Sequence, residues 1–418
     1  MSHYIVIPIF SDSSIHPLHK DNRLSLLYVK KLGEKSEMLT FNHLDQLQAD
    51  SFDFLGDDVI LTPNKKFLLY AHPFKNVYDI SLLNYYAQNI PLNTLDLRSE
   101  ALNILYDSYY GFSNTNEIIP IYKHLEYCDA ISDEIERIWE KRHDVNFESY
   151  EKYNEEAILS FYSIDKRGIK VSGVWDKKLR KHVSNGTLYS DCSLHTSTGR
   201  PSNNFGGVNF VALDSDKKKY VVPKNDMLIE FDYDAFHVRL IANLIDYEFP
   251  EGSAHDHLAK LYCVDREEGK KMTFQYLYGG VPWEVVQLNP FFDSVNNLIE
   301  ILWEEFNDTG KIETPIYKRP IFKRNHVDIT KTKLFNYYIQ AAETEQNIKT
   351  IIKLQRYLYK RKTQLILYIY DAFLIDFSNE DGIDILKKIK KILESDNHLT
   401  KSKVGFDYGS MKDASHKL

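Results

Sequence analysis

Several features that assign proteins to membranes or to the outside of the cell are missing from this sequence. Its 418 residues include three cysteines, which form neither a Cys-x-x-Cys pair nor a disulfide framework, so a reducing compartment such as the cytoplasm is expected. No apolar run approaches the ~20 residues needed to span a bilayer, and the first ten residues lack the basic start of a signal peptide. Membrane and secreted classes are therefore disfavoured.

Excess positive charge is also lacking. The formal net charge of −8 gives no overall attraction to nucleic acid, so any such binding must come from local basic patches. The candidate patches are 217–219 and 353–362, for which a solvated loop and a solvated helix end are the alternatives. What is present is typical of a soluble globular protein, with 43% hydrophobic and 27% charged residues in a chain long enough for two or three domains.

The hydrophobic pattern predicts that the first part of the chain mixes strands and helices. Short apolar runs between turn-forming residues indicate strands, whereas apolar residues spaced three and four apart indicate helices. Strands are expected at 4–10, 24–30 and 37–41, with further candidates at 59–61 and 67–70, and helices at 77–88, 131–139 and 150–165. A turn into a strand follows at 166–171, and the main domain boundary is predicted between 145 and 190.

The second part is predicted to contain longer helices around a few strands. Residues 227–233 have the pattern of a strand, and 365–377 that of an apolar hairpin. Helices are expected at 235–245, 283–306 (interrupted at Pro290), 334–359 and 382–393, and shorter strands at 312–322 and 404–408.

One stretch of this second part repeats its chemistry every four residues. Arg266, Lys270, Phe274 and Tyr278 fall on one stripe of a helix, which ends at Gly279-Gly280 where the backbone needs a positive φ. Two cations can hold a polyphosphate and two aromatic rings can stack a base, so the stripe fits a nucleoside triphosphate. The alternative is an ordinary amphipathic helix with its aromatic rings in the core.

Two aspartates occupy positions suited to metal binding. Asp232 stands at the end of the 227–233 strand, directly before a helix that it could also merely cap. Asp371 stands inside the apolar hairpin, where an unpaired carboxylate would be costly and therefore needs a partner or a metal. A third acidic motif, His255-Asp256-His257, lacks a further ligand at suitable spacing, which favours a structural or nucleotide-adjacent role over zinc.

The order of these motifs resembles the polymerase domain of family A DNA polymerases, the DNA polymerase I family. The resemblance covers 190–418 and rests on seven short motifs in the family's order. They are Thr196–Ser202 (TSTGRPS), Asp232-Tyr233 with Arg239 (motif A), Arg266 to Gly279 (motif B), Gly310 to Thr314, Asn336 with Gln340, Tyr370-Asp371 (motif C) and 404–414.

The resemblance implies a multidomain α+β fold with a right-hand polymerase palm and fingers and an antiparallel palm sheet. It further implies that Asp232, Asp371 and the backbone carbonyl of Tyr233 hold two Mg²⁺ ions, for which Mn²⁺ can substitute. Arg266 and Lys270 would grip the triphosphate, with Lys270 also a general acid. The remaining implied contacts are Phe274, Tyr278 and His237 for the nucleotide, and Thr198, Arg200, Arg239, Asn336, Gln340 and Tyr370 for primer and template.

The sequence departs from the family pattern at three positions in or beside these motifs. Tyr370 stands where the family usually has His, and Ala372 where it has a secondary acid, which predicts weaker metal binding. His237 replaces the family's sugar-gating Glu. A ring at this position could exclude a 2′-hydroxyl by bulk, but the selection between deoxy- and ribonucleotides is left open.

The first 145 residues resemble the family's 3′–5′ exonuclease domain, which has a ribonuclease H-like fold. Such a nuclease needs a cluster of acids for two metals. Here the first strand has no Asp-x-Glu, Leu68 stands where an Asp belongs, and Asp129 alone is retained. We therefore expect a degenerate exonuclease-like domain at 1–145, a connector or vestigial thumb at 146–190, and palm and fingers at 191–418, with the fingers near 250–310.

Together these features predict a template-directed DNA polymerase without proofreading, compact as in a phage or mobile element and acting in the host cytoplasm. Its partners would be primer–template DNA, dNTPs and a processivity or replisome protein, because little of the chain is left for a thumb. The rival interpretation is a catalytically idle nucleic-acid-binding scaffold on the same fold.

Overall fold

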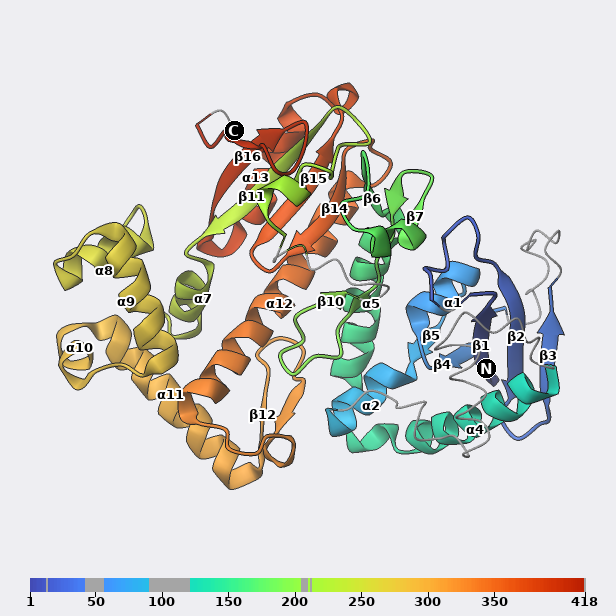
Figure 1. Cartoon of the computed structure of the whole chain (residues 1–418). Helices are drawn as coiled ribbons and strands as arrows, with labels where there is room; N and C mark the ends of the chain where they lie inside the picture. Colours follow the sequence, from blue (N-terminus) through green and yellow to red (C-terminus); the bar gives the residue numbers. More distant parts are fainter. Residues whose placement is uncertain (13, 42–55, 90–120, 204–209, 211–212, 417–418) are drawn as a thin grey trace. The chain divides into compact units, whose positions relative to one another are not determined.

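The computed structural model describes residues 1–12, 14–41, 56–89, 121–203, 210 and 213–416, which include all the predicted site residues. Contacts within the chain divide it into two compact units (Figure 1). The first unit comprises 1–195 and 202–209, and the second comprises 196–201 and 210–418. The predicted connector 146–190 thus packs with the first unit. Among the described helices, none is both long and apolar enough to cross a membrane.

The first unit is built on a five-stranded mixed sheet. Its strands are β1 (His3–Phe10), β2 (Leu24–Lys31), β3 (Ser36–Thr40), β4 (Val59–Thr62) and β5 (Val77–Asp79). They lie in the order β3-β2-β1-β4-β5, with β1–β2 and β2–β3 antiparallel and the last two pairs parallel. This mixed sheet agrees with the exonuclease-type α/β domain that the resemblance predicted.

Four described helices pack on this sheet. They are α1 (Lys65–Ala71), α2 (Ile80–Gln88), α4 (Ile121–Glu140) and α5 (Phe147–Arg167). The prediction of a strand at 67–70 is wrong, because these residues lie in α1. The side chain of Asn64 accepts a hydrogen bond from the N–H of Phe67 at 3.1 Å, a helix cap that outweighs the apolar run after it.

The segment 168–203 contains short elements only. Within it the structure describes a 3-10 helix of six residues (Lys177–His182) and two-residue strands, of which the last are β9 (Cys192–Ser193) and β10 (Ser202–Asn203). No helix of this described segment is long enough to form the helical thumb of the family. The reduced thumb expected from the sequence stays a prediction.

The second unit is organised around an antiparallel sheet. Its strands are β11 (Met227–Asp234), β14 (Gln364–Ile369), β15 (Ala372–Phe377), β16 (Leu399–Gly405) and β17 (Lys412–Asp413), in the order β14-β15-β11-β16-β17. The predicted strand and hairpin are confirmed, and β11 lies at the centre of the sheet.

Helices surround this sheet and form a separate helical lobe (yellow and orange in Figure 1). They are α6 (Ser215–Lys218), α7 (Phe236–Leu244), α8 (Ala254–Tyr262), α9 (Arg266–Gly279), α10 (Trp283–Leu288), α11 (Pro290–Thr309), α12 (Lys331–Leu358) and α13 (Asp384–Leu393), with the small hairpin β12 (Lys311–Glu313) and β13 (Pro320–Phe322). The predicted interruption at Pro290 is confirmed, because Pro290 opens α11 after the cap residue Asn289.

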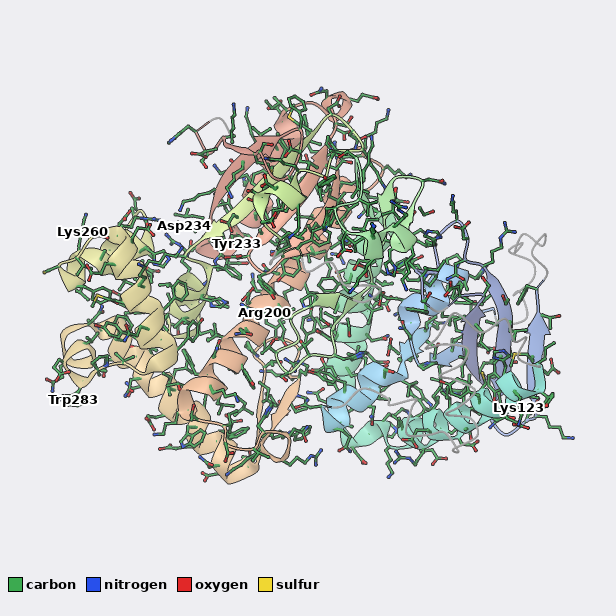
Figure 2. The ribbon with its side chains drawn as sticks, in the orientation of Figure 1. Lys123, Arg200, Tyr233, Asp234, Lys260 and Trp283 are labelled. Carbon is green, nitrogen blue, oxygen red and sulfur yellow. The ribbon has the colours of Figure 1, made fainter. Side chains whose placement is uncertain are left out.

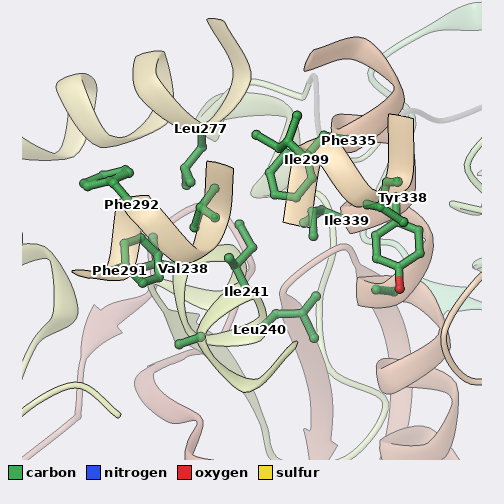
Figure 3. Packing of buried hydrophobic residues seen from close by; sticks show 14 of the residues in the cluster. Val238, Leu240, Ile241, Leu277, Phe291, Phe292, Ile299, Phe335, Tyr338 and Ile339 are labelled. Atoms are coloured by element: carbon green, nitrogen blue, oxygen red, sulfur yellow. The ribbon is translucent and has the colours of Figure 1, made fainter. Parts of the chain in front are cut away.

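A hydrophobic core joins α7, α9, α11 and α12. Figure 3 shows Val238 and Ile241 of α7 packed with Leu277 of α9, Phe291 of α11 and Phe335 of α12, all almost completely buried. Full burial of each such side chain contributes about 1.5–3 kcal/mol. The core therefore fixes the position of α9 relative to the end of β11, which matters for the site.

Candidate active site

The central strand β11 presents a row of acids on one face. Successive side chains of a strand point to opposite faces, so Glu230, Asp232 and Asp234 share one face. On the other face, the hydroxyl of Tyr233 donates a hydrogen bond to the carbonyl of Leu393 at 3.0 Å. Figure 2 labels Tyr233 and Asp234 at the end of the strand. The alternation thus separates an acidic face from a packed one.

Only the outer two acids of this row are neutralised. The ammonium group of Lys403 lies 2.7 Å from Glu230, and Lys401 forms an ion pair with Asp234. Among the described residues, no lysine or arginine forms an ion pair with Asp232. The neighbouring strand β16 therefore supplies a lysine to each of the two outer acids but no ion-pair partner to Asp232, which lies between them.

Asp371 is brought to Asp232 by the turn between β14 and β15. Asp232 pairs with Ala372 across the sheet, and the N–H of Tyr233 donates to the carbonyl of Asp371 at 3.0 Å. Tyr370 has a φ of +54°, a strained value for a residue with a side chain, and Asn347 of α12 holds its carbonyl at 2.8 Å. The turn is fixed from two sides, so Asp371 has little freedom to move away.

The electrostatics of the two aspartates reflect their surroundings. Burial, then the charge of Asp371, then that of Glu230 raise the pKa of Asp232 to about 6. Burial and then the charge of Glu343 raise the pKa of Asp371. For Asp234 burial alone would raise the pKa, but the hydrogen bond and charge of Lys401 outweigh it and lower the pKa. The charges of Lys403 and Lys401 oppose the rise at Asp232, and that of Arg200 opposes it at Asp371. Two neighbouring carboxylates that form no ion pair among the described residues provide a site for a bound cation.

Helix α9 turns Arg266 and Lys270 of the predicted stripe away from the core, whereas Tyr278 packs against it. Its buried positions are Gly269, Thr273 and Leu277, whereas Arg266 and Lys270 are in contact with solvent. A Cβ on Gly269 would lie 2.5 Å from the Cβ of Ala259 in α8, so the close approach of α8 and α9 requires glycine. The alternative in which the stripe's aromatic rings belong to the core is therefore wrong for Phe274, which lines a cavity.

The two cations of the stripe differ in their contacts. Arg266 lies 3.1 Å from Asp256 and 3.5 Å from Asp234. Lys270 forms no ion pair among the described residues. Asp265 caps the helix by accepting from the N–H groups of Glu267 and Glu268. Lys270 is thus available to a ligand, whereas a ligand must compete with carboxylates for Arg266.

These elements enclose one cavity of about 270 Å³. It is lined by Arg200, Asp232, Tyr233, Asp234, Ala235, Phe236, His237, His255, Arg266, Lys270, Phe274, Glu343, Tyr370, Asp371 and Lys401. Nine of the predicted site residues are in this set. Tyr278 is outside it but contacts His237 through its hydroxyl group. Acids from two strands and cations from α9 therefore meet in one space.

Arg200 reaches this cavity from the turn at 196–201. Its guanidinium lies 4.4 Å from the centre of the Tyr370 ring and pairs with Glu343. Thr198 is buried in the same turn, where its hydroxyl lies 3.5 Å from the N–H of Arg200. Figure 2 labels Arg200.

Three predicted residues lie elsewhere. Arg239 donates to the carbonyl of Gly252 at 2.6 Å and lines a different cavity beside α7. Asn336 and Gln340 bond to each other on α12, at 2.8 Å. The structure thus does not bring these three into the cavity that holds Asp232 and Asp371.

Sequence reasoning missed Glu343, Asp234 and Lys401 as site residues. Asp234 and Lys401 could have been found from the i, i+2 spacing of acids on β11 and of lysines on β16. Glu343 gave no comparable signal, because it stands in an ordinary polar stretch of a long helix and reaches the site only through packing. His255 also lines the cavity, and burial lowers its pKa to about 4.

The residues present fit a divalent metal in part. Asp232 and Asp371 are oxygen ligands of the kind that Mg²⁺ prefers, and the backbone carbonyl of Tyr233 is adjacent. No group of three or more His, Cys, Asp or Glu side chains with metal-binding geometry occurs among the described residues, at His255-Asp256-His257 or elsewhere. Further ligands must therefore come from water, backbone or substrate, as is usual for Mg²⁺ at a phosphate site.

In the first unit, the retained acid of the exonuclease motifs is already occupied. Asp129 accepts a hydrogen bond from the hydroxyl of Tyr28 at 2.7 Å. Leu68, at the position of a missing acid, is completely buried. The described part of this unit contains no acid cluster that could hold two metals.

Comparison with known proteins supports the fold suggested by this geometry. No family model matches the chain, and no curated protein matches it. Among solved structures, this chain is similar to the POL domain of Pol1 from M. smegmatis, determined in complex with DNA primer–template and dNTP. The chain therefore has the polymerase fold that the motifs predicted. The TM-score is 0.69 at 12% sequence identity, over 98% of this chain and 96% of that chain. The likeness confirms the fold, and the chemistry must be argued from the site.

Proposed function

We propose that this protein is a template-directed DNA polymerase that adds deoxynucleotides to a primer 3′ end by nucleotidyl transfer. The observation that carries the proposal is the selective absence of counter-ions at Asp232 and Asp371 among the described residues. The acids on either side of Asp232 along the strand, Glu230 and Asp234, each form an ion pair with a lysine. The lack of an ion pair at Asp232 is therefore not a general property of the strand. A similar fold that was solved with primer–template and dNTP supports the choice of substrate.

The roles of the residues follow from their positions in the cavity. Asp232, Asp371 and the carbonyl of Tyr233 would hold divalent metal, taken to be two Mg²⁺ ions. When bound, these ions would activate the primer hydroxyl and stabilise the leaving pyrophosphate. Lys270 and Arg266 would bind the triphosphate, since both are on the cavity face of α9. Phe274 would stack beside the base.

Proton transfer and primer positioning can also be assigned to this chain's own groups. Lys270, which has no carboxylate partner among the described residues, would donate a proton to the departing pyrophosphate. Arg200 would hold the primer end, because it enters the cavity beside Tyr370 and Asp371. The catalytic effect of such groups comes from positioning and charge neutralisation.

The first unit and the short connector lead to further proposals. We propose that the enzyme does not proofread, and that a compact chain of this kind serves a phage or mobile element in the host cytoplasm. Because no long helix follows α5 in the described connector, we expect weak retention on duplex DNA and a need for a processivity partner. The isolated chain should then add only a few nucleotides per binding event in a trap assay.

Primer extension with Mg²⁺ and dNTPs on a primer–template is the decisive test. Template-dependent extension would support the proposal and would be abolished by EDTA. The second candidate is a catalytically idle scaffold, favoured by the loss of the secondary acid at Ala372. Binding of primer–template without extension under any metal or partner condition would establish that scaffold instead.

A further inference from the structure

Glu343 is a buried acid that the proposed reaction does not yet use. It lies on α12 with 1% of its surface exposed and lines the candidate active site. An unpaired carboxylate at such a depth would cost several kcal/mol, so its partners are informative. The oxygen Oε2 contacts Nη2 of Arg200 and lies 2.5 Å from Nε2 of His237. The acid thus bridges two residues from separate segments.

The other edge of the His237 ring is held as well. Nδ1 of His237 contacts the hydroxyl of Tyr278 on α9. Burial and then the charge of Glu343 raise the pKa of Tyr278, so its hydroxyl keeps its proton and can either donate to Nδ1 or accept from it. Nε2 of the same ring lies 2.5 Å from Oε2 of Glu343 and 3.1 Å from Nη2 of Arg200. Both ring nitrogens are satisfied by the protein.

This saturation has a consequence for a sugar bound against the ring. His237 lines the same cavity as Asp232 and Phe274, where the nucleotide sugar would lie if the proposed function holds. Because both ring nitrogens already have hydrogen-bond partners, the ring cannot form a hydrogen bond to a 2′-hydroxyl group that lies against it. Such a hydroxyl would lose its hydrogen bonds to water and gain none from the protein. An unsatisfied buried hydroxyl costs about 1–3 kcal/mol.

We propose that Glu343 is a positioning residue for nucleotide selection: it fixes the His237 imidazole between itself and Tyr278, so that the ring excludes ribonucleotides. This inference rests on the proposed function. The two side chains of this device stand on different helices, His237 on α7 and Glu343 on α12. Arg200 balances the charge that this arrangement places in the site.

The test compares the incorporation of dNTP and the matching NTP by wild type and by two variants. In Glu343→Ala the ring can rotate and offer Nε2 to the 2′-hydroxyl, so the preference for dNTP should fall by about tenfold or more, the equivalent of one hydrogen bond. Glu343→Gln keeps an acceptor but loses the charge, and should lower the preference less. Glu345→Gln is the matched control, because it removes a buried carboxylate two residues away that instead accepts from Thr314 and the N–H of Ile316.

A double variant separates this role from a merely structural one. His237→Glu alone places two carboxylates in contact and should impair both activity and selection. Adding Glu343→Gln removes the repulsion and lets the carboxylate introduced by His237→Glu accept from Tyr278 and Arg200, so the preference for dNTP should return towards the wild-type value. A structural role would predict two additive losses instead of this recovery.

The outcomes distinguish the inference from the function on which it rests. If wild type extends a primer but uses dNTP and NTP equally, or if Glu343→Ala and Glu343→Gln keep the wild-type preference, the inference is overturned and the polymerase proposal stands. Lower use of NTP in Glu343→Ala would assign Glu343 the opposite role, as a partner of the ribose. If Glu343→Ala does not fold, Glu343→Gln and the double variant still decide. A wild type that incorporates neither nucleotide overturns both proposals.

Discussion

In the first unit, the acids beside the sheet are held by partners of this chain, whereas in the second unit two acids near the end of the central strand form no ion pair among the described residues. Asp129 is bonded to Tyr28, and the side chain of Asp79 accepts from the N–H groups of Lys65 and Leu82. Asp232 and Asp371 are held in an unfavourable setting instead, because burial and the charge of neighbouring carboxylates act on both.

The clearest contrast is between Asp232 and a buried cluster of the first unit. There the ammonium group of Lys66 lies 2.8 Å from Asp165 and 2.6 Å from Asp191, and all three side chains are almost fully buried. Burial lowers the pKa of Lys66, but the two carboxylates outweigh it and raise the pKa, so the cation is retained. The buried charges of the first unit are thus paired with each other within the protein. Asp232, which we propose binds a ligand, has no such ion pair among the described residues.

The largest effect is expected at the unmatched acids. Asp232→Asn or Asp371→Asn should lower primer extension by about 10³-fold or more, because neither amide can replace the charge that holds metal. The fold should be retained, since each change relieves repulsion. Steady-state extension rates and circular dichroism measure the two effects. Glu230→Gln, on the same strand but paired with Lys403, is the control and should keep most activity.

A binding measurement checks the same point without activity. Mg²⁺ should raise the melting temperature of the wild-type protein and have a smaller effect on either variant. Extension at more than a few per cent of the wild-type rate in Asp232→Asn or Asp371→Asn would place the metal site elsewhere.

The next effect, on stability, is expected at the matched cluster. Lys66→Met should destabilise the protein by about 3–5 kcal/mol, because it leaves Asp165 and Asp191 buried beside each other without a cation. Urea unfolding measures the change. Lys31→Met removes the exposed pair with Glu34 and should give no measurable change. Equal stability of the two variants would show that the buried cluster is not needed for the fold.

The contrast between the units also explains what the sequence could predict. Strand and helix patterns, the order of motifs and the stripe on α9 depend on local spacing, so most elements and nine cavity residues were foreseen. The strand predicted at 67–70 failed because a single capping side chain, Asn64, decided the local structure. Glu343 was missed because its burial and its contact with His237 arise only when α12 packs against α7.

The pairing of charges is the least predictable feature. Nothing in the spacing of Glu230, Asp232 and Asp234 indicates which of the three remains unpaired, because the answer depends on the register of β16. In the same way, Lys66 and Asp191 are far apart in the sequence and meet only in the folded unit. The motifs identified the acids, and the tertiary structure determined which of them form ion pairs.

A smaller, pH-dependent effect is expected beside the Lys66 cluster. Burial lowers the pKa of His16 to about 4, with Lys66 and His19 acting in the same direction and Asp191 opposing them. Above pH 6.5 the ring is neutral in both states. Between about pH 6.5 and pH 4 the unfolded state binds a proton at His16 that the folded state does not bind. The free energy of unfolding therefore decreases as the pH is lowered through this range, and below about pH 4 His16 causes no further loss.

Over this window His16 should account for up to about 3 kcal/mol of lost stability. Urea unfolding at pH 7 and pH 4.5 measures the loss. In His16→Phe, whose ring can keep the stacking on Tyr189, the loss over the same window should be smaller. An identical pH dependence in wild type and variant would show that His16 titrates normally.

No effect at all is expected from the first unit, for which the sequence predicts a degenerate exonuclease-like domain. Two metals need several converging acids, and Asp129 is a single carboxylate whose oxygen already accepts from Tyr28. A labelled primer incubated with Mg²⁺ or Mn²⁺ and no dNTPs should therefore keep its full length, and Asp129→Ala should leave both this result and the extension rate unchanged. Asp232→Asn in the same assay controls for degradation by pyrophosphorolysis in the polymerase site. Shortening of the primer from its 3′ end that persists in Asp232→Asn and disappears in Asp129→Ala would mean that the first unit keeps a working nuclease site, and that internal pairing of an acid does not mark loss of function.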